Sequence, residues 1–271
     1  MSGLGYQLRL GRLFSAESGR SFVTAIDHGV TLGVPPGAED AVGTVERIIA
    51  GGPDAVLLGP GLLAKTSHLF AHRGAPAPIV RADFFINHPY IDDHGEHYRV
   101  LIEPADAAAM GAEAIILFLM LGSGGEAMFA DNVATIGRVA QEAHRVGIPL
   151  IVEAVLWGSK IADKKDADRL AFACRLAVEI GADAIKTEYT GDVESMRQVI
   201  AGCPAPVLVL GGAKSGSPDA ILSATRDAMA AGAKGVIYGR NVWQADDVVG
   251  ISRQLREIIH GAAPVPAAIS R

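Results

Sequence analysis

The chain has 271 residues, of which 49% are hydrophobic and 20% are charged, and its formal net charge is −6. This composition can bury a large core, which excludes an intrinsically disordered protein. The acidic balance excludes the broad basic face of a nucleic-acid-binding protein, but it is compatible with a local site for an anionic ligand.

Residues 1–20 lack the apolar segment of a signal peptide, and the longest apolar runs have the length of strands. A membrane span would need about 20 apolar residues, so we expect a cytoplasmic protein without membrane contact. The two cysteines, Cys174 and Cys203, belong neither to a CxxC pair nor to a histidine cluster. A disulfide framework and a structural zinc site are therefore not expected.

Eight short apolar runs, rich in Val and Ile, alternate with longer amphipathic segments. Runs without polar alternation are typical of strands buried on both faces, as in a parallel sheet. The runs are Phe22–Ile26, Ala55–Leu58, Pro78–Val80, Ala114–Met120, Pro149–Val155, Ala184–Lys186, Pro206–Leu210 and Gly235–Tyr238. Eight strands with short connections favour a closed barrel over an open sheet, and the length is close to the roughly 250 residues typical of such barrels. We predict one α/β domain over residues 1–271, a (β/α)₈ TIM barrel.

Helical spacing of apolar residues appears between the runs. The predicted helices are Ala127–Val146, Asp166–Ile180, Ser217–Ala231 and Gln244–Ile259. A further helical segment around Gln7–Phe14 precedes the first strand and is expected to lie outside the repeat. In the third of these helices, Pro218 suits the first turn.

Chemistry in such barrels lies at the carboxyl ends of the strands, so polar residues there are candidates for the site. The first strand ends in Asp27 and His28. A carboxylate and an imidazole leaving a buried strand together are costly unless they are paired or used. The alternative is that Asp27 only caps the following loop.

A long loop, Asp83–Ile102, follows the third strand and contains a group rich in His and Asp. Its members are His88, Asp92, Asp93, His94 and His97. The group superficially resembles metal ligands, but its place within one long loop favours a mobile lid or a subunit contact. His28 has no second set of His and carboxylate ligands at metal spacing either. We therefore expect neither a metal nor another cofactor.

The sixth strand ends in Lys186, within GADAIKTEYTGD. Burial lowers the pKa of an amine, and a neutral amine can attack a carbonyl carbon. Lys186 is thus a candidate nucleophile. The alternative is a lysine that is paired with a carboxylate such as Glu188 or Asp192.

Strands seven and eight end in turns that contain glycine, Gly211–Gly212 and Gly239–Arg240. The loops after these two strands often bind phosphate through backbone N–H groups, and an arginine adds a forked, charged donor. A lysine on strand six beside such turns is the pattern of an aldolase that holds a sugar phosphate.

Three segments, RLFSAESGRSFVTAIDHG, GADAIKTEYTGD and GRNVWQ, resemble the class I aldolase family of archaeal and bacterial fructose-bisphosphate aldolases. The family also contains the autoinducer-2 thiolase and the aminodideoxyheptulosonate synthases, and the resemblance covers nearly the whole chain. It implies that Lys186 forms a Schiff base and that Asp27 assists acid/base chemistry or substrate binding. It also implies that the two glycine turns with Arg240 hold phosphate, and that the protein is a homo-oligomer, often a decamer.

Strand five departs from the pattern of the fructose-bisphosphate aldolases. They carry a tyrosine proton donor there, whereas this chain reads PLIVEAVLWGSK and has Val155 at that position and Trp157 at the position of the following arginine. Glu153 lies two residues before Val155 and therefore on the same face of the strand. It is a candidate acid/base or, alternatively, a counter-ion for Lys186 or Lys160.

Three functions fit these residues. The first is a Schiff-base lyase that cleaves or forms a C–C bond in a phosphorylated ketose-type substrate. The second is a thiolase-like transfer of an acyl group from a phosphorylated diketone to coenzyme A, and the third is a non-catalytic regulator that binds a phosphorylated ligand. The catalytic candidates are Lys186, Asp27 and Glu153, and the binding candidates are Gly211, Gly212, Gly239, Arg240 and His28.

Overall fold

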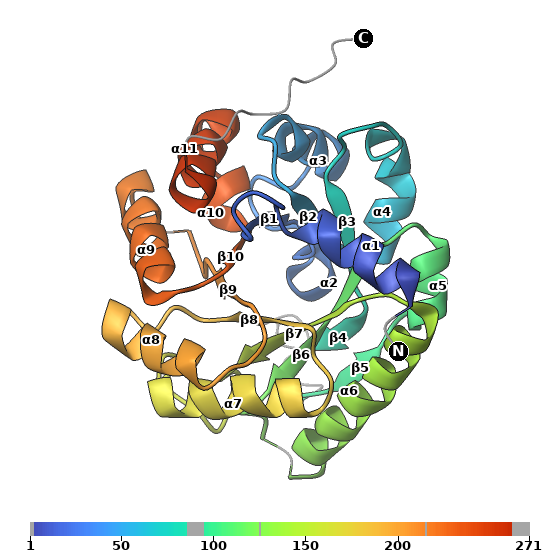
Figure 1. The fold of residues 1–271 in the computed structure, drawn as a ribbon, viewed down its shortest axis with the longest axis vertical. Helices are drawn as coiled ribbons and strands as arrows, with labels where there is room; N and C mark the ends of the chain where they lie inside the picture. Colours follow the sequence, from blue (N-terminus) through green and yellow to red (C-terminus); the bar gives the residue numbers. More distant parts are fainter. Residues whose placement is uncertain (1–2, 86–94, 125, 215, 262–271) are drawn as a thin grey trace.

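The computed structural model describes residues 3–85, 95–124, 126–214 and 216–261. These residues form a closed barrel of eight parallel strands surrounded by helices (Figure 1). The barrel strands are β1 (Ser21–Ala25), β2 (Ala55–Leu58), β3 (Ala77–Arg81), β6 (Ala114–Met120), β7 (Leu150–Val155), β8 (Ala184–Thr187), β9 (Val207–Leu210) and β10 (Gly235–Tyr238). Each coincides with a predicted strand to within one residue at either end, so the prediction of a (β/α)₈ barrel is confirmed.

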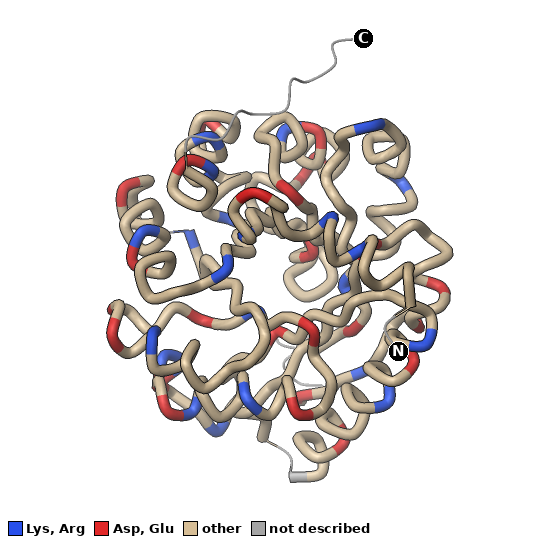
Figure 2. Tube along the Cα trace, viewed as in Figure 1, with Lys and Arg blue, Asp and Glu red and all other residues tan. Residues whose placement is uncertain are grey.

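Helices cover the outer face of the barrel. They are α3 (Ala41–Ala50), α4 (Pro60–Thr66), α5 (Pro104–Ala109), α6 (Glu126–Val146), α7 (Ala167–Glu179), α8 (Val193–Ala201), α9 (Pro218–Ala231) and α11 (Val248–His260). The short helices α2 (Gly29–Leu32) and α10 (Arg240–Trp243) follow β1 and β10, and a 3₁₀ turn, η1, spans Ser67–Leu69. Lys and Arg are mixed with Asp and Glu around the outer ring of helices (Figure 2). A site for an anion therefore has to come from a local arrangement rather than from a charged face.

The predicted helix Gln244–Ile259 is wrong in its first turn. The chain forms α10, breaks, and begins α11 only after Asp247. The side chain of Asp247 accepts a hydrogen bond from the N–H of Gly250 at 2.8 Å, which is a typical N-cap. An apolar periodicity that continues through the break hides this cap in the sequence.

Helix α1 (Leu4–Leu13) begins three residues earlier than predicted and closes the amino end of the barrel (Figure 1). The hydroxyl of Tyr6 donates to Asp183 Oδ1 at 2.8 Å, and Arg9 Nη1 donates to the carbonyl of Gly147 at 2.9 Å. Asp183 and Gly147 come just before β8 and β7. The barrel is therefore open for ligands at its carboxyl end.

The sequence predicts one long loop over Asp83–Ile102, but part of this segment forms two strands. Strands β4 (Asp83–Phe85) and β5 (Tyr98–Val100) pair as an antiparallel ribbon. Phe85 lies opposite Tyr98 in this ribbon, and both rings are buried. Cross-strand aromatic pairs stabilise such ribbons. Of the five His and Asp residues noted above, His97 precedes β5, and the other four lie outside the described residues.

The barrel interior is apolar at its middle and charged at its carboxyl end. Side chains alternate between the interior and the outer layer along each strand, so Ile79 and Ile151 belong to the inner cluster. On three of these strands the next inward-facing residue towards the carboxyl end is charged. It follows Ile79 in β3, Ile151 in β7 and Ala184 in β8 by two positions. These residues are Arg81, Glu153 and Lys186.

Candidate active site

A cavity of about 300 Å³ opens at the carboxyl end of the barrel. All eight residues that the sequence singled out line this cavity. They are Asp27, His28, Glu153, Lys186, Gly211, Gly212, Gly239 and Arg240. The strand-end positions therefore converge on one space, although they come from five different strands.

Lys186 lies on β8 with its side chain only 8% exposed. Its Nζ is 2.8 Å from Oε1 of Glu153, which is its direct neighbour across the β7–β8 pairing. The pairing of Lys186 with a carboxylate is confirmed for Glu153, which the sequence offered as one possible counter-ion, and it is wrong for Glu188 and Asp192. Glu188 accepts a hydrogen bond from Trp157 Nε1 at 3.3 Å, and Asp192 caps α8.

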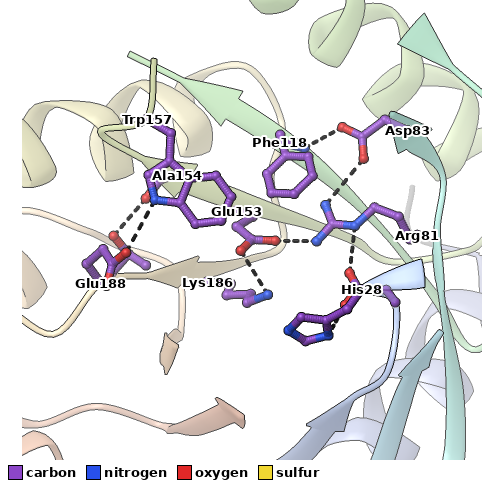
Figure 3. Close-up of polar contacts among 11 residues, drawn as sticks. His28, Arg81, Asp83, Phe118, Glu153, Ala154, Trp157, Lys186 and Glu188 are labelled. Atoms are coloured by element: carbon purple, nitrogen blue, oxygen red, sulfur yellow. Dashed lines mark hydrogen bonds and ion pairs between the residues drawn. The ribbon is translucent and has the colours of Figure 1, made fainter. Parts of the chain in front are cut away.

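Arg81 was missed in the sequence, yet it stands at the centre of the polar network (Figure 3). Its side chain is 1% exposed and contacts three carboxylates. Nε donates to Asp27 Oδ2 at 2.9 Å, Nη1 donates to Asp83 Oδ1 at 3.3 Å, and Nη2 donates to Oε2 of Glu153. The guanidinium carbon also lies 3.8 Å from the centre of the Phe118 ring. One cation thus joins carboxylates from three strands.

A signal for Arg81 was available in the sequence. PIVRADFF places an arginine at the end of an apolar strand and an aspartate, Asp83, two residues later. The strand-end rule that selected Asp27 applies equally to Arg81.

The network shifts the pKa values of Asp27 and Asp83 in opposite directions. Burial acts to raise the pKa of Asp27, but the charges of Arg81 and Lys186 outweigh it and lower that pKa to about 2. For Asp83, burial outweighs the opposing charge of Arg81 and raises the pKa to about 6. Asp27 is therefore a permanent anion near neutral pH, while Asp83 is close to taking up a proton.

His28 forms part of the cavity wall. Its ring stands edge-on to Trp243 with the ring centres 5.5 Å apart, and its Nδ1 is 3.6 Å from Asp27 Oδ1. Burial lowers the pKa of His28 despite the charge of Asp27, so the ring is neutral at pH 7. A Cβ atom at Gly239 would lie 2.4 Å from Cε1 of this ring, so only glycine fits beneath it.

The turns after β9 and β10 are tied together by Asn241, which the sequence did not identify. Its side-chain amide donates to the carbonyls of Gly211 at 2.8 Å and Ala213 at 3.1 Å. Gly212 has a φ of +63°, a conformation that favours glycine. The two turns that were predicted to bind phosphate are therefore held side by side.

Arg240 is half-buried at the edge of these turns. Within the described ranges, no carboxylate lies within ion-pair distance of it, and its buried Nε has no hydrogen-bond partner. Burial lowers the pKa of Arg240, but an arginine remains charged at neutral pH. Among the described residues it is a cation in the cavity without an ion-pair partner.

The end of β7 has the departure that the sequence indicated. Val155 is fully buried in an apolar cluster with Phe118 and Leu210 and offers no proton. Trp157 extends this wall, with its ring centre 5.6 Å from that of Phe118. The titratable group of β7 that reaches the cavity is Glu153.

Among the residues that the structure describes, no three His, Cys, Asp or Glu side chains are arranged to hold a metal ion. In the same part of the chain, no helix is long and apolar enough to cross a bilayer.

A family model and several known proteins are similar to this chain over most of its length. Residues 21–245 match the model of the DeoC/LacD family aldolases. An uncharacterized aldolase of Saccharolobus solfataricus is 35% identical over 269 residues, which cover 98% of each chain. The 2-amino-3,7-dideoxy-D-threo-hept-6-ulosonate synthase of Halobacterium salinarum is 33% identical over 272 residues, which cover 100% of this chain and 97% of that protein.

A solved structure has the same fold. It is an archaeal fructose-1,6-bisphosphate aldolase whose catalytic lysine is covalently bound to the carbinolamine intermediate of the substrate. The TM-score is 0.82 at 25% sequence identity, and the match covers 94% of this chain and 100% of the archaeal chain.

Proposed function

This chain belongs to the DeoC/LacD family of class I aldolases, and from that premise we propose that it cleaves or forms a C–C bond in a phosphorylated ketose-type substrate through a Schiff base on Lys186. One observation carries the proposal: an almost fully buried amine faces the cavity with a carboxylate oxygen 2.8 Å away. A nucleophilic lysine needs such a partner to take up and return its protons.

The pair of Lys186 and Glu153 can supply the whole proton cycle of Schiff-base formation. The ammonium of Lys186 gives a proton to Oε1 of Glu153, and the neutral amine attacks the ketone carbon. Glu153 then returns the proton to the hydroxyl of the carbinolamine, which leaves as water. Glu153, now a carboxylate again, takes the proton of the hydroxyl on the β carbon. The bond between the α and β carbons breaks, its electron pair forms an enamine on Lys186, and an aldehyde is released. Glu153 returns the proton to the enamine carbon, and water hydrolyses the resulting iminium to free Lys186.

Asp27 has a different part in this proposal. Because its pKa is held at about 2, it takes up a proton poorly. A permanent carboxylate can accept a hydrogen bond from a substrate hydroxyl and stabilise the positive iminium. We therefore assign binding and electrostatic stabilisation to Asp27, with His28 as a neutral neighbour of the substrate.

The phosphate of the substrate is proposed to bind between the turns Gly211–Gly212 and Gly239–Arg240. The support is the guanidinium of Arg240, which has no ion-pair partner among the described residues and lies next to two turns that Asn241 holds together. Backbone N–H groups and a forked arginine suit a phosphate. The archaeal structural relative is, by its name, an aldolase of a phosphorylated sugar.

A second candidate function is acyl transfer from a phosphorylated diketone to coenzyme A. Val155 favours it, since an apolar residue stands where fructose-bisphosphate aldolases have their tyrosine. Both functions use Lys186, and they differ in the second substrate.

A panel of ketose phosphates and diketone phosphates, with and without coenzyme A, tests the proposal. We expect aldehyde release without coenzyme A, and its loss in Lys186→Met, where methionine replaces the aliphatic stem at similar volume. Turnover that requires coenzyme A would replace the lyase by the thiolase. If the panel gives neither turnover nor borohydride trapping, the hypothesis of a non-catalytic regulator that binds a phosphorylated ligand gains weight.

A further inference from the structure

Arg81 makes more polar contacts than a residue that only fills space in the barrel would need. It is 1% exposed, and each of its three guanidinium nitrogens faces a different carboxylate. A well-packed apolar side chain of similar volume would fill such a position at lower cost than a buried cation. The arrangement therefore has a reason other than filling the barrel.

The contacts of Glu153 indicate what that reason is. Its two oxygens have separate partners, since Oε2 faces Arg81 and Oε1 faces Lys186 at 2.8 Å (Figure 3). A carboxylate without the contact at Oε2 could rotate about its side-chain bonds and present either oxygen, or neither, to the amine. Proton transfer in catalysis is efficient only within hydrogen-bond reach.

The plane of the guanidinium is itself fixed. The Phe118 ring lies beneath it at 3.8 Å, and Asp27 and Asp83 hold Nε and Nη1. The four protein partners come from β1, β4, β6 and β7, so the orientation of Arg81 does not depend on any one loop. Asp83 is in turn held by the N–H of Phe118, at 2.5 Å from Oδ2.

We propose that Arg81 is a positioning residue, which holds the carboxylate of Glu153 so that Oε1 faces Lys186 and can exchange protons with it. Arg81 acts on Lys186 through Glu153, which lies between the two cations. The inference rests on the proposed function of Lys186, and it adds the residue that makes the proton cycle possible without the tyrosine that fructose-bisphosphate aldolases have at the position of Val155 in β7.

The test is the rate at which borohydride traps dihydroxyacetone phosphate, used as the probe ketone, on the full-length protein. Arg81→Lys keeps the positive charge but loses the forked geometry. We expect it to bind the probe within about threefold of the unchanged protein, because the proposed phosphate contacts remain. The trapping rate should fall by about 10²-fold, as misplacement of a reacting group by about 1 Å can do.

The pH profile separates positioning from a purely structural role. Asp27, Asp83 and Glu153 face residue 81 from three strands, and Lys186 lies beyond Glu153. Carboxylates protonate more readily when they lose hydrogen bonds to their charged form. In Arg81→Lys the acid limb of the trapping rate should therefore move to higher pH.

Arg256→Lys is the matched control. Arg256 is another arginine with little exposed surface, although its side chain is 14% exposed. It contacts the carbonyl of Gly52 and the carboxylate of Asp54 near the start of β2, at the opposite end of the barrel. The same substitution there should lower the melting temperature and leave the trapping rate and its pH profile unchanged.

The outcomes are distinct. If the unchanged protein gives no adduct, the proposed function fails and this inference fails with it. If the unchanged protein gives the adduct and folded Arg81→Lys traps at the same rate with the same pH profile, the inference alone is overturned.

If Arg81→Lys does not fold by circular dichroism, Phe118→Leu decides with the same readouts, because it removes the ring beneath the guanidinium and keeps all charges. A smaller rate loss and acid-limb shift in the same direction would support the inference, and an unchanged rate would overturn it.

Discussion

The two ends of the barrel use polar side chains in different ways. At the amino end, Arg12 of α1 pairs with Glu113 and Tyr6 bonds to Asp183, at positions that are partly open to solvent. At the carboxyl end, Arg81 and Lys186 are buried beside a cavity and share one glutamate. The first set fastens a helix over the barrel, and the second set faces the space where a ligand can bind.

The exposed contacts of the amino end and the buried charges of the carboxyl end differ in their effect on the free energy of folding. Exposed ion pairs contribute between 0 and about 1 kcal/mol, so the contacts of α1 are cheap and individually replaceable. Buried charges lose several kcal/mol of hydration each, and their pairing only partly restores it. A barrel that retains five buried charged side chains at one end, Asp27, Arg81, Asp83, Glu153 and Lys186, gives up stability for chemistry. The following substitutions should separate the two ends.

The largest effect is expected for Glu153→Gln. It keeps the shape of the side chain but removes the proton acceptor of Lys186, so turnover should fall by about 10²- to 10⁴-fold. The Michaelis constant should change little, since the proposed phosphate contacts are untouched. Steady-state kinetics on the best substrate of the panel measures both values.

Glu188→Gln is the control for this substitution. It removes a carboxylate that lies outside the cavity lining and bonds to Trp157, and its turnover should stay within a fewfold of normal. Near-normal turnover in Glu153→Gln would show that another group handles the protons.

Arg240→Ala should have the next largest effect, on binding. The loss of a charge-assisted contact to phosphate should raise the Michaelis constant by roughly 10- to 100-fold and lower turnover less. An unphosphorylated analogue of the same ketose should be affected little by the substitution. If turnover fell alone, Arg240 would act in the chemical step.

Asp83→Asn should change stability in a pH-dependent way. Burial raises the pKa of Asp83 to about 6, so its ionised form in the folded protein is a net cost at pH 7. The cost disappears as the pH falls from about 6 towards 4, because the folded protein then binds the proton that the unfolded chain does not. The variant should be more stable at pH 7 by on the order of 1–3 kcal/mol and lose this advantage near pH 4.

Urea unfolding at several pH values between 4 and 7 measures this difference. Asp27 behaves in the opposite sense, since its pKa is lowered to about 2 and its stabilisation is lost only as the pH falls below about 4. A variant Asp83→Asn that is less stable than the unchanged protein at pH 7 would contradict the assignment of Asp83.

The smallest effect is expected at the amino end. Tyr6→Phe removes a partly buried hydrogen bond to Asp183 and should lower the free energy of unfolding by about 1 kcal/mol. Turnover should be unchanged, because α1 lies at the far end of the barrel from the cavity. A change in turnover without loss of folded protein would mean that the two ends are coupled.

The fold could be predicted because the two sequence features that indicate it, the apolar runs and the spacing between them, can be recognised without knowing which strands pair. Uninterrupted apolar runs such as Ala114–Met120 mark buried strands, and their number and spacing imply closure. The strand-end rule then identified Lys186, Asp27 and Arg240 one residue at a time. It needed no knowledge of which strands are neighbours.

The pairing within the site was harder to predict because it depends on register. Glu188 is two residues from Lys186, but Glu153 is its neighbour across the β7–β8 pairing. Arg81 meets partners 54 and 72 residues away, which no local pattern reveals. A homo-oligomer larger than a dimer stays a prediction, which light scattering tests.

The identity of the nucleophile can be measured directly. The full-length protein would be reduced with borohydride in the presence of a phosphorylated ketone, digested, and examined by mass spectrometry for the modified peptide. We expect one adduct on Lys186 and none in Lys186→Arg, because a guanidinium stays protonated and cannot attack the ketone. An adduct on Lys160, Lys164 or Lys214 in the unchanged protein would contradict the assignment of Lys186 and of the proton cycle built on Glu153.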